Sequence, residues 1–233
     1  MLRVLDLFSG IGAYSLGLER AEMKVAAFCE IEEYPRRVLR RHWPDTPIYD
    51  DIKTLTMARL RADGVTINGL VAGWPCTDIS EAKQQAKGLA GAQSGLWFEI
   101  ERLLQENGEP LDFVLLENST RLRSKGLEIV LGALDALGYD AEWHCLTARA
   151  FNAPHERDRL WIVAYPHGHP PVWPAIARQE RPAWASEPDI PRVAYGVADQ
   201  PHRRAACGNC NPPIIPEIIG RAILASKQTE AAA

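Results

Sequence analysis

The chain has 233 residues, of which 46% are hydrophobic and 24% charged, with a formal net charge of −4 and a pI of about 5.9. No segment is apolar for long enough to span a membrane, and residues 1–8 lack the basic stretch and long apolar run of an export signal. We therefore expect a cytoplasmic protein, in which the five cysteines are reduced. The length of the chain favours one main domain. The acidic balance excludes a general electrostatic attraction to nucleic acid, so any such contact must rest on local clusters of Arg.

Short apolar runs alternate with amphipathic stretches from the start of the chain. Residues 3–8 read as a buried strand, 13–21 as a helix and 24–29 as a second strand, which together predict a βαβ unit. Strands that alternate with helices predict an α/β fold, with a doubly wound, mostly parallel sheet covered on both faces. The alternation continues through expected helices at 33–42, 95–105 and 125–137, and expected strands at 69–72, 113–117, 141–146 and 160–165.

The composition changes at Pro166, where a stretch rich in Pro, Trp, Arg and Gly begins. We expect an irregular surface region or a small subdomain up to about Pro213, with a disordered linker as the alternative. Trp173 and Trp184 favour packing or a binding surface. The chain closes with an apolar-periodic helix at 214–226 that returns to the core. The expected organisation is therefore a main unit over 1–165, a short region over 166–206 and a C-terminal segment over 207–233.

A glycine turn, Asp6 to Gly12 (DLFSGIG), follows the first strand and opens the first helix. Glycine lets the backbone come close to a ligand above the strand ends without steric cost. The second strand ends at Glu30, the position at which doubly wound folds accept hydrogen bonds from ribose hydroxyls. The turn lacks the full G-x-G-x-x-G pattern, so it favours a nucleoside without a pyrophosphate. A solvated strand-end carboxylate is the alternative for Glu30.

A Pro-Cys pair follows the expected strand at 69–72, within the block Gly73 to Ser80 (GWPCTDIS), where the Cys76 thiol would face the same crevice as the nucleoside. Here the sequence resembles the DNA cytosine-5 methyltransferase family. The resemblance covers nearly the whole chain except residues 166–206. It runs in family order through Asp6 to Gly12, Gly73 to Ser80, Gly88 to Phe98 (GLAGAQSGLWF), Glu117-Asn118, Ala153 to Arg159, and Gly208-Asn209 with Pro213.

The family's chemistry explains these residue types. Carbon 5 of cytosine is too weak a nucleophile to take a methyl group, so a thiolate first adds to carbon 6 and turns carbon 5 into an enamine carbon. The resemblance assigns this addition to Cys76, and proton donation or hydrogen bonding at nitrogen 3 to Glu117. It assigns the fixing of the flipped base to Arg157 and Arg159. Taken singly, each has an ordinary alternative: a buried thiol, a solvated carboxylate or a surface charge pair.

S-adenosylmethionine is the cofactor that the resemblance implies, with S-adenosylhomocysteine as the product. Glu30 corresponds to the ribose position, and Asp51 with Ile52 to the adenine position. The other residues assigned to this site are Phe8, Gly10, Ile11, Gly12, Ile31, Pro75, Leu96 and Asn209. We expect no metal, because the C-x-x-C pair Cys207 and Cys210 lacks a second ligand pair at zinc-site spacing.

Double-stranded DNA is the implied partner, and restriction-modification in a bacterial or phage-infected cell is the implied setting. Base recognition is expected in residues 166–206, which would form a short target-recognition insertion. Residues 77–94 are expected to form a mobile loop that closes over DNA. We expect a monomer, and whether a partner protein assists target recognition stays open. Two Arg clusters are candidates for DNA contact, although a solvated helix face explains the first equally well. They are Arg36, Arg37, Arg40 and Arg41, and the scattered Arg178, Arg181, Arg192, Arg203 and Arg204.

Departures from the family pattern put loop closure and rate in question. They are Trp74, Thr77, Ser119 and His155. An RNA cytosine methyltransferase remains an alternative, for which contact to the 2′-hydroxyl is the discriminator. A catalytically silent DNA-binding relative is a second alternative, against which Cys76, Glu117 and Arg159 stand. A nicotinamide-dependent oxidoreductase would have no use for Cys76 and Glu117 at these positions.

Overall fold

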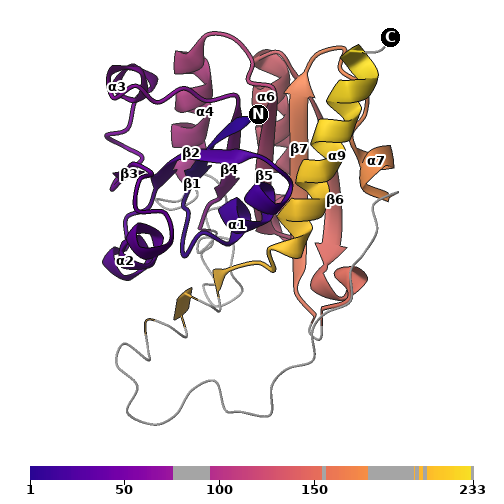
Figure 1. Ribbon diagram of the computed structural model, residues 1–233. Helices are drawn as coiled ribbons and strands as arrows, with labels where there is room; N and C mark the ends of the chain where they lie inside the picture. The colour runs from indigo at the N-terminus through magenta and orange to yellow at the C-terminus, as the bar shows by residue number, and fades with distance from the viewer. Residues whose placement is uncertain (76–94, 154–155, 178–201, 203–204, 207–208, 232–233) are drawn as a thin grey trace, which may run out of the picture.

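The computed structural model describes residues 1–75, 95–153, 156–177, 202, 205, 206 and 209–231 (Figure 1). Its strands are β1 (Arg3–Leu7), β2 (Lys24–Cys29), β3 (Ile48–Tyr49), β4 (Gly69–Gly73), β5 (Phe113–Ser119), β6 (Tyr139–Thr147) and β7 (Asp158–Pro166). Within the described residues they form a seven-stranded sheet in the order β3-β2-β1-β4-β5-β7-β6. The first five are parallel, and β7 is antiparallel to both β5 and β6. The mixed α/β architecture with a mostly parallel sheet is therefore confirmed.

Helices cover both faces of this sheet. They are α1 (Ala13–Arg20), α2 (Glu33–His42), α3 (Met57–Ala62), α4 (Leu96–Asn107), α5 (Leu122–Lys125), α6 (Leu127–Ala136), α7 (Trp173–Ala177) and α9 (Ile214–Ala231), and a 3₁₀ turn spans Ala148–Phe151. In Figure 1, α1, α7 and α9 lie in front of the sheet, whereas α3, α4 and α6 lie behind it. The two layers agree with the doubly wound arrangement that the alternating pattern predicts.

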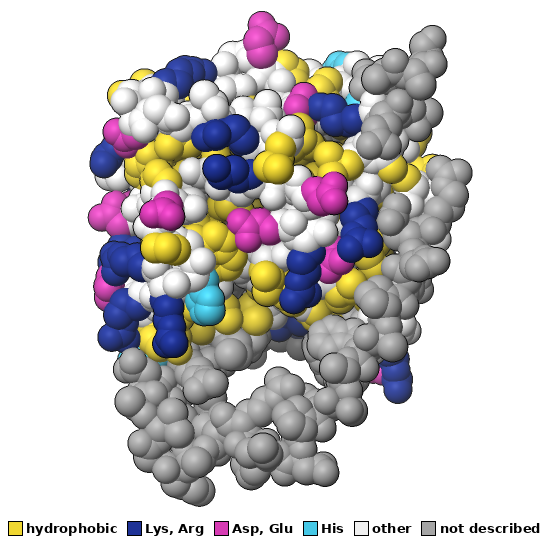
Figure 2. Space-filling view, in the orientation of Figure 1, with side chains coloured by type: hydrophobic (Ala, Val, Ile, Leu, Met, Phe, Trp, Pro, Cys, Tyr) yellow, Lys and Arg dark blue, Asp and Glu magenta, His cyan; other side chains and the backbone are white. Residues whose placement is uncertain are grey.

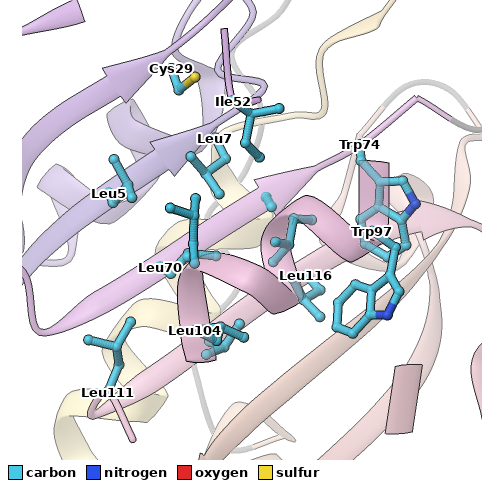
Figure 3. Packing of buried hydrophobic residues seen from close by; sticks show 14 of the residues in the cluster. Leu5, Leu7, Cys29, Ile52, Leu70, Trp74, Trp97, Leu104, Leu111 and Leu116 are labelled. Carbon is cyan, nitrogen blue, oxygen red and sulfur yellow. The ribbon is translucent and has the colours of Figure 1, made fainter. Parts of the chain in front are cut away.

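Alternate side chains of each strand point to opposite faces of the sheet, so the core consists of one part on each face. On β5, Val114 and Leu116 belong to the cluster that α4 and α6 cover, whereas Phe113 and Leu115 belong to the cluster that α1 and α9 cover. Successive side chains of a strand point to opposite faces, so a strand buried on both sides is apolar throughout. Figure 3 shows the first cluster, in which Leu7, Leu70 and Leu116 from neighbouring strands meet side chains of α4.

The structure differs from the sequence prediction mainly where elements are short. None of β3, α3 and α5 was expected. The helix expected at 125–137 is found as α6, which Gly126, with a φ of 157°, separates from the short α5. The region after Pro166 is not irregular from its start, because α7 packs there with Val172 and Ile176 buried in the α9 cluster. The helix α9 also extends beyond the predicted end. No helix among the described residues is long and apolar enough to cross a lipid bilayer.

Candidate active site

The ends of β1 and β4 lie side by side, and this is where the sheet changes direction. The chain runs outward from β1 through β2 to β3 and then returns to place β4 on the other side of β1, with Asp6 paired to Val71 and Leu7 to Ala72. Ligands of open α/β sheets bind in the crevice outside the carboxyl ends of the strands at such a point. The glycine turn after β1 and the exposed Pro75 after β4 therefore open onto one crevice.

The glycine turn is tight and depends on left-handed backbone conformations. Phe8, Gly10 and Gly12 have φ values of 55°, 53° and 83°. The Ser9 hydroxyl donates to the Asp6 carbonyl at 2.6 Å, and the Gly12 amide donates to the Ser9 carbonyl at 2.9 Å. A Cβ on Gly12 would lie 2.6 Å from the Trp43 ring, so both the conformation and the space require glycine there.

Glu30 ties the end of β2 to this turn. Its Oε2 accepts from the Gly10 amide and its Oε1 from the Glu32 amide, each at 2.7 Å. Burial raises the pKa of Glu30, and these two amide hydrogen bonds oppose the shift. Each carboxylate oxygen can accept a second hydrogen bond. The next side chain, Ile31, is 64% exposed, so an apolar surface lies beside the carboxylate, as a nucleoside site requires.

The loop after β3 places Asp51 and Ile52 differently. The side chain of Asp51 is half-buried and its Oδ1 accepts from the Lys53 amide at 2.9 Å, whereas Ile52 is buried in the core beside Leu7 (Figure 3). Arg102 of α4 secures this loop, because its Nη2 donates to the carbonyls of Ile52 and Leu55, each at 2.9 Å. Only Asp51 of the predicted pair therefore turns its side chain toward solvent.

The carboxylate of Glu117 lies at the end of β5 on the α1 side of the sheet, where it is 7% exposed. Its neighbour across the sheet is Gly73, three residues before Cys76. Arg159 of β7 places its Nε 2.8 Å from Glu117 Oε1, and the Tyr14 hydroxyl donates to Oε2 at 2.8 Å. The structure thus brings two predicted catalytic residues, Glu117 and Arg159, into contact beside the end of β4.

Arg157 lies just before β7 and bonds to the segment that leads into α9. Its Nε donates to Asn211 Oδ1 at 2.9 Å, and its Nη2 donates to the Asn209 carbonyl at 3.0 Å. Burial lowers the pKa of the Arg157 guanidinium, and the charge of Arg159 lowers it further. Asn209 is exposed and lies against Arg157, so the described contacts place it on the arginine side of the site.

Comparison with known proteins identifies the family to which the chain belongs. The profile of the C-5 cytosine-specific DNA methylase family matches residues 2–209. The chain belongs to this family. Type II methyltransferase M2.BsuMI of Bacillus subtilis (strain 168) is 30% identical over 169 residues, which are 70% of this chain and 42% of that protein. Type II methyltransferase M.NgoBI of Neisseria gonorrhoeae is 31% identical over 186 residues, 78% of this chain and 56% of that protein. The chain spans about half the length of these curated relatives.

Solved structures of DNA methylases share the fold. A DNA modification methyltransferase encoded within an E. coli prophage superposes with a TM-score of 0.60 at 23% identity, over 71% of this chain and 47% of that one. The S. pombe Dnmt2 methyltransferase gives a TM-score of 0.57 at 20% identity, over 70% of this chain and 49% of that one. These matches show that the sheet and its helices have the arrangement of a methyltransferase fold.

The exit of β4 departs from the methylase pattern at Trp74, which the structure places in the core. Trp74 is 3% exposed and packs against Trp97 of α4, with ring centroids 5.7 Å apart (Figure 3). Its carbonyl accepts from Asn118 Nδ2 at 3.3 Å, which ties the exits of β4 and β5 together. Leu96, at the start of α4, is partly buried against the same cluster. The Trp74 ring therefore belongs to the core on the α4 side of the sheet.

The predicted nucleophile Cys76, the loop at 77–94 and His155 lie outside the described residues. Among the described cysteines, burial raises the pKa of Cys29 to about 12, so that this thiol is not ionised near neutral pH. Cys145 is exposed on β6, the edge strand of the sheet farthest from β1. Neither residue lies at the end of β4, where a methylase nucleophile is expected.

The Arg cluster on α2 is partly neutralised. Arg36 and Arg40 form ion pairs with Glu33 at 2.8 Å and 3.0 Å. In Figure 2, Lys and Arg side chains gather at the lower left, where α2 lies in Figure 1, together with acidic side chains. Exposed ion pairs on one helix are ordinary surface features, so this cluster does not by itself indicate a DNA-binding surface.

Sequence reasoning missed three residues of this site: Tyr14, Asn211 and Arg102. Tyr14 follows the glycine turn directly and reads as an apolar core position of α1. Asn211 lies among prolines before α9, with no local pattern. Arg102 had one readable signal, because Glu99 and Glu106 flank it at the spacing of helical ion pairs and it stands beside buried leucines.

Proposed function

We propose that this chain transfers a methyl group from S-adenosylmethionine to carbon 5 of cytosine in duplex DNA. The observation that carries the proposal is the contact between Glu117 and Arg159 beside the end of β4, the strand that leads to Cys76. A carboxyl group that carries a proton can donate to the basic ring nitrogen of cytosine, and a guanidinium can donate to the carbonyl oxygen beside it. Family membership supports the same reaction.

The chemistry assigned to each residue conserves atoms and charge. The Cys76 thiolate forms a bond to carbon 6 as the 5,6 double bond opens, while Glu117 donates a proton to nitrogen 3, where negative charge develops, and Arg159 donates to the carbonyl oxygen. When bound, S-adenosylmethionine supplies an electrophilic methyl group for carbon 5. Loss of the carbon 5 proton to water then restores the double bond and expels the Cys76 thiolate, and the proton on nitrogen 3 returns to Glu117. Since carbons 5 and 6 are inaccessible in a duplex, the target base must leave the helix.

A methyl-transfer assay tests this function directly. Incubation with S-adenosylmethionine carrying a labelled methyl group should label duplex DNA, and digestion should recover the label as 5-methylcytosine. Structured RNA of matched composition serves as the comparison, because the catalytic groups do not distinguish DNA from RNA. Label in RNA alone would favour the RNA alternative, and label in neither would contradict the proposal. Bisulfite sequencing of DNA from cells that express the chain would then give the target sequence.

The cofactor is proposed to lie at the glycine turn, with its ribose hydroxyls on Glu30. The fit rests on two observations, since the Glu30 oxygens retain accepting capacity and Ile31 is exposed beside them. Gly10, Ile11 and Gly12 would line the methionine side of the site. Asp51 would contact the adenine, while the described position of Ile52 limits it to packing behind the loop.

We expect Glu30→Ala to lower the affinity for S-adenosylmethionine by roughly tenfold or more, because a buried hydrogen bond to a ligand contributes about 1–3 kcal/mol. Isothermal titration calorimetry measures this directly. Glu32→Ala is the matched control, because its side chain is exposed and only its backbone amide contacts Glu30. Unchanged affinity in Glu30→Ala would move the cofactor to another part of the fold.

Target recognition is proposed to lie in the region 166–206. Residues 166–177 contribute Val172 and Ile176 to the core, so we assign recognition to the residues that follow α7. At the far end of the region, the ring of His202 stacks on Tyr34 of α2 with centroids 5.9 Å apart. His202 therefore lies against α2, and the adjacent Arg37 and Arg41 are candidates for phosphate contacts there.

A further inference from the structure

A buried series of hydrogen bonds connects Arg157 to Glu117. Arg157 Nε donates to Asn211 Oδ1 at 2.9 Å, Asn211 Nδ2 donates to the Tyr14 hydroxyl at 3.0 Å, and that hydroxyl donates to Glu117 Oε2 at 2.8 Å. Tyr14 is 7% exposed and Asn211 is 1% exposed. Four separate parts of the chain therefore meet in one polar network inside the α1 side of the core.

The direction of each hydrogen bond follows from the chemistry of the groups. A guanidinium only donates, so the Asn211 carbonyl oxygen must face Arg157 and its amide nitrogen must face Tyr14. Because that nitrogen donates to the tyrosine oxygen, the single hydroxyl proton is directed to Glu117. Burial raises the pKa of Tyr14 well above its ordinary value, and the charge of Glu117 adds to the shift. The hydroxyl therefore stays protonated and keeps donating.

Close packing holds Tyr14 in this position. The rings of Tyr14 and Trp161 pack edge to face, with their centroids 5.8 Å apart and their planes at 89°. A Cβ on Gly73 would lie 2.4 Å from the Tyr14 hydroxyl, and a Cβ on Gly17 would lie 2.2 Å from the Pro213 carbonyl. Glycine at both positions thus makes room for the hydroxyl and for the segment that carries Asn211.

The two oxygens of Glu117 are used differently. Oε2 accepts the Tyr14 hydrogen bond, whereas Oε1 is 2.8 Å from Arg159 Nε as an ion pair and accepts no hydrogen bond within the described part of the chain. We propose that Tyr14 is a positioning residue that, with Asn211, holds Oε2 and thereby orients the carboxyl group of Glu117 for its action on nitrogen 3 of the target cytosine. This role rests on the proposed function and gives Tyr14 an effect on the reaction without contact to the substrate.

Tyr14→Phe removes the hydroxyl and keeps the ring against Trp161. We expect the single-turnover rate constant of methyl transfer to fall about tenfold, which corresponds to the loss of one hydrogen bond to a charged group. The Kd for S-adenosylmethionine and the KM for DNA should stay within twofold. Tyr165→Phe is the matched control, because Tyr165 is buried in the same cluster but its hydroxyl bonds to Glu142. Its rate constant should not change.

Two further variants separate positioning from a general loss of structure. In a Glu117→Gln background, Tyr14→Phe should lower the single-turnover rate constant by less than about twofold. The effects of two substitutions are not additive when one residue acts through the other. Asn211→Asp still accepts from Arg157 but cannot donate to Tyr14, so it should slow transfer in the presence of Tyr14 and add little in Tyr14→Phe. Equal losses from Tyr14→Phe in both Glu117 backgrounds would overturn the positioning role.

The remaining outcomes distinguish the two proposals. If the unaltered chain transfers methyl groups and Tyr14→Phe is equally fast, the positioning role fails and the proposed function stands. If the unaltered chain transfers none, the proposed function fails and the role of Tyr14 falls with it. A loss of rate that parallels a fall in Tm, with weaker cofactor binding, would show that Tyr14 only supports the core.

Discussion

Duplex DNA that carries 5-fluorocytosine should become covalently attached to this chain when S-adenosylmethionine is supplied, and not without it. Turnover ends with loss of the carbon 5 proton, and a fluorine at that position cannot leave as a cation, so the bond between Cys76 and carbon 6 should persist. Denaturing gel electrophoresis with labelled DNA measures the adduct. Cys76→Ser should abolish both the adduct and methyl transfer, because a hydroxyl is far less ionised than a thiol near neutral pH.

The other cysteines provide the controls for this experiment. We expect variants that retain Cys76 and lack Cys29, Cys145 or Cys210 to form the adduct at the normal rate. Cys29 is the sharpest comparison, because it also lies at the end of a strand beside the crevice and burial raises its pKa to about 12. An adduct in a variant whose only cysteine is not Cys76 would remove Cys76 from its assigned role.

Glu117→Gln should lower the single-turnover rate constant by roughly a hundredfold or more, the range that general acid catalysis contributes. The amide keeps the size and one accepting oxygen of the carboxyl group but can no longer supply a proton or a charge at nitrogen 3. The rate is measured with excess enzyme over DNA, and cofactor affinity should change little, because the residues proposed to bind the cofactor follow β1, β2 and β3 rather than β5.

Glu217→Gln is the matched control for Glu117. Glu217 is also a buried carboxylate on the α1 side of the sheet, 8% exposed and paired with Arg221, but it lies on α9. Its replacement should affect Tm and leave the rate constant within twofold. Comparable rate losses in the two variants would show that Glu117 stabilises the fold rather than the reaction.

Sequence periodicity predicted the helices and strands that are long enough to show a regular pattern of buried residues. The strands β1, β2, β4, β5 and β7 are buried on both faces and read as apolar runs, and α4 and α6 show helical spacing of apolar residues. Elements with too few residues for a period were missed, such as the two-residue β3. Helix α7 was missed because Pro174 and its surroundings dominate the composition, while Val172 and Ile176, the buried residues of this stretch, are too few to set a period.

The residues of the candidate site likewise fall into two groups, those that the local sequence could predict and those that it could not. Residues that act close to their neighbours in sequence, such as Gly12 and Glu30, were predictable because the turn and the strand end carry local signals. The contact between Tyr14 and Asn211 joins residues 197 positions apart, and nothing local to either residue specifies the other. Such a pair becomes visible only when α1 and α9 are packed together.

The packing of α9 against α1 has a consequence for the order in which the protein becomes competent during synthesis. The glycine turn, Glu30 and the loop at Asp51 come from the first part of the chain and contact one another, so this part can assemble while the ribosome is still at work. Glu117 receives the fully oriented Tyr14 hydroxyl only after Asn211 and α9 have emerged and closed on α1. A nascent chain would therefore assemble the residues proposed to bind the cofactor before it could orient the carboxyl group of Glu117, because that orientation requires Asn211 and α9.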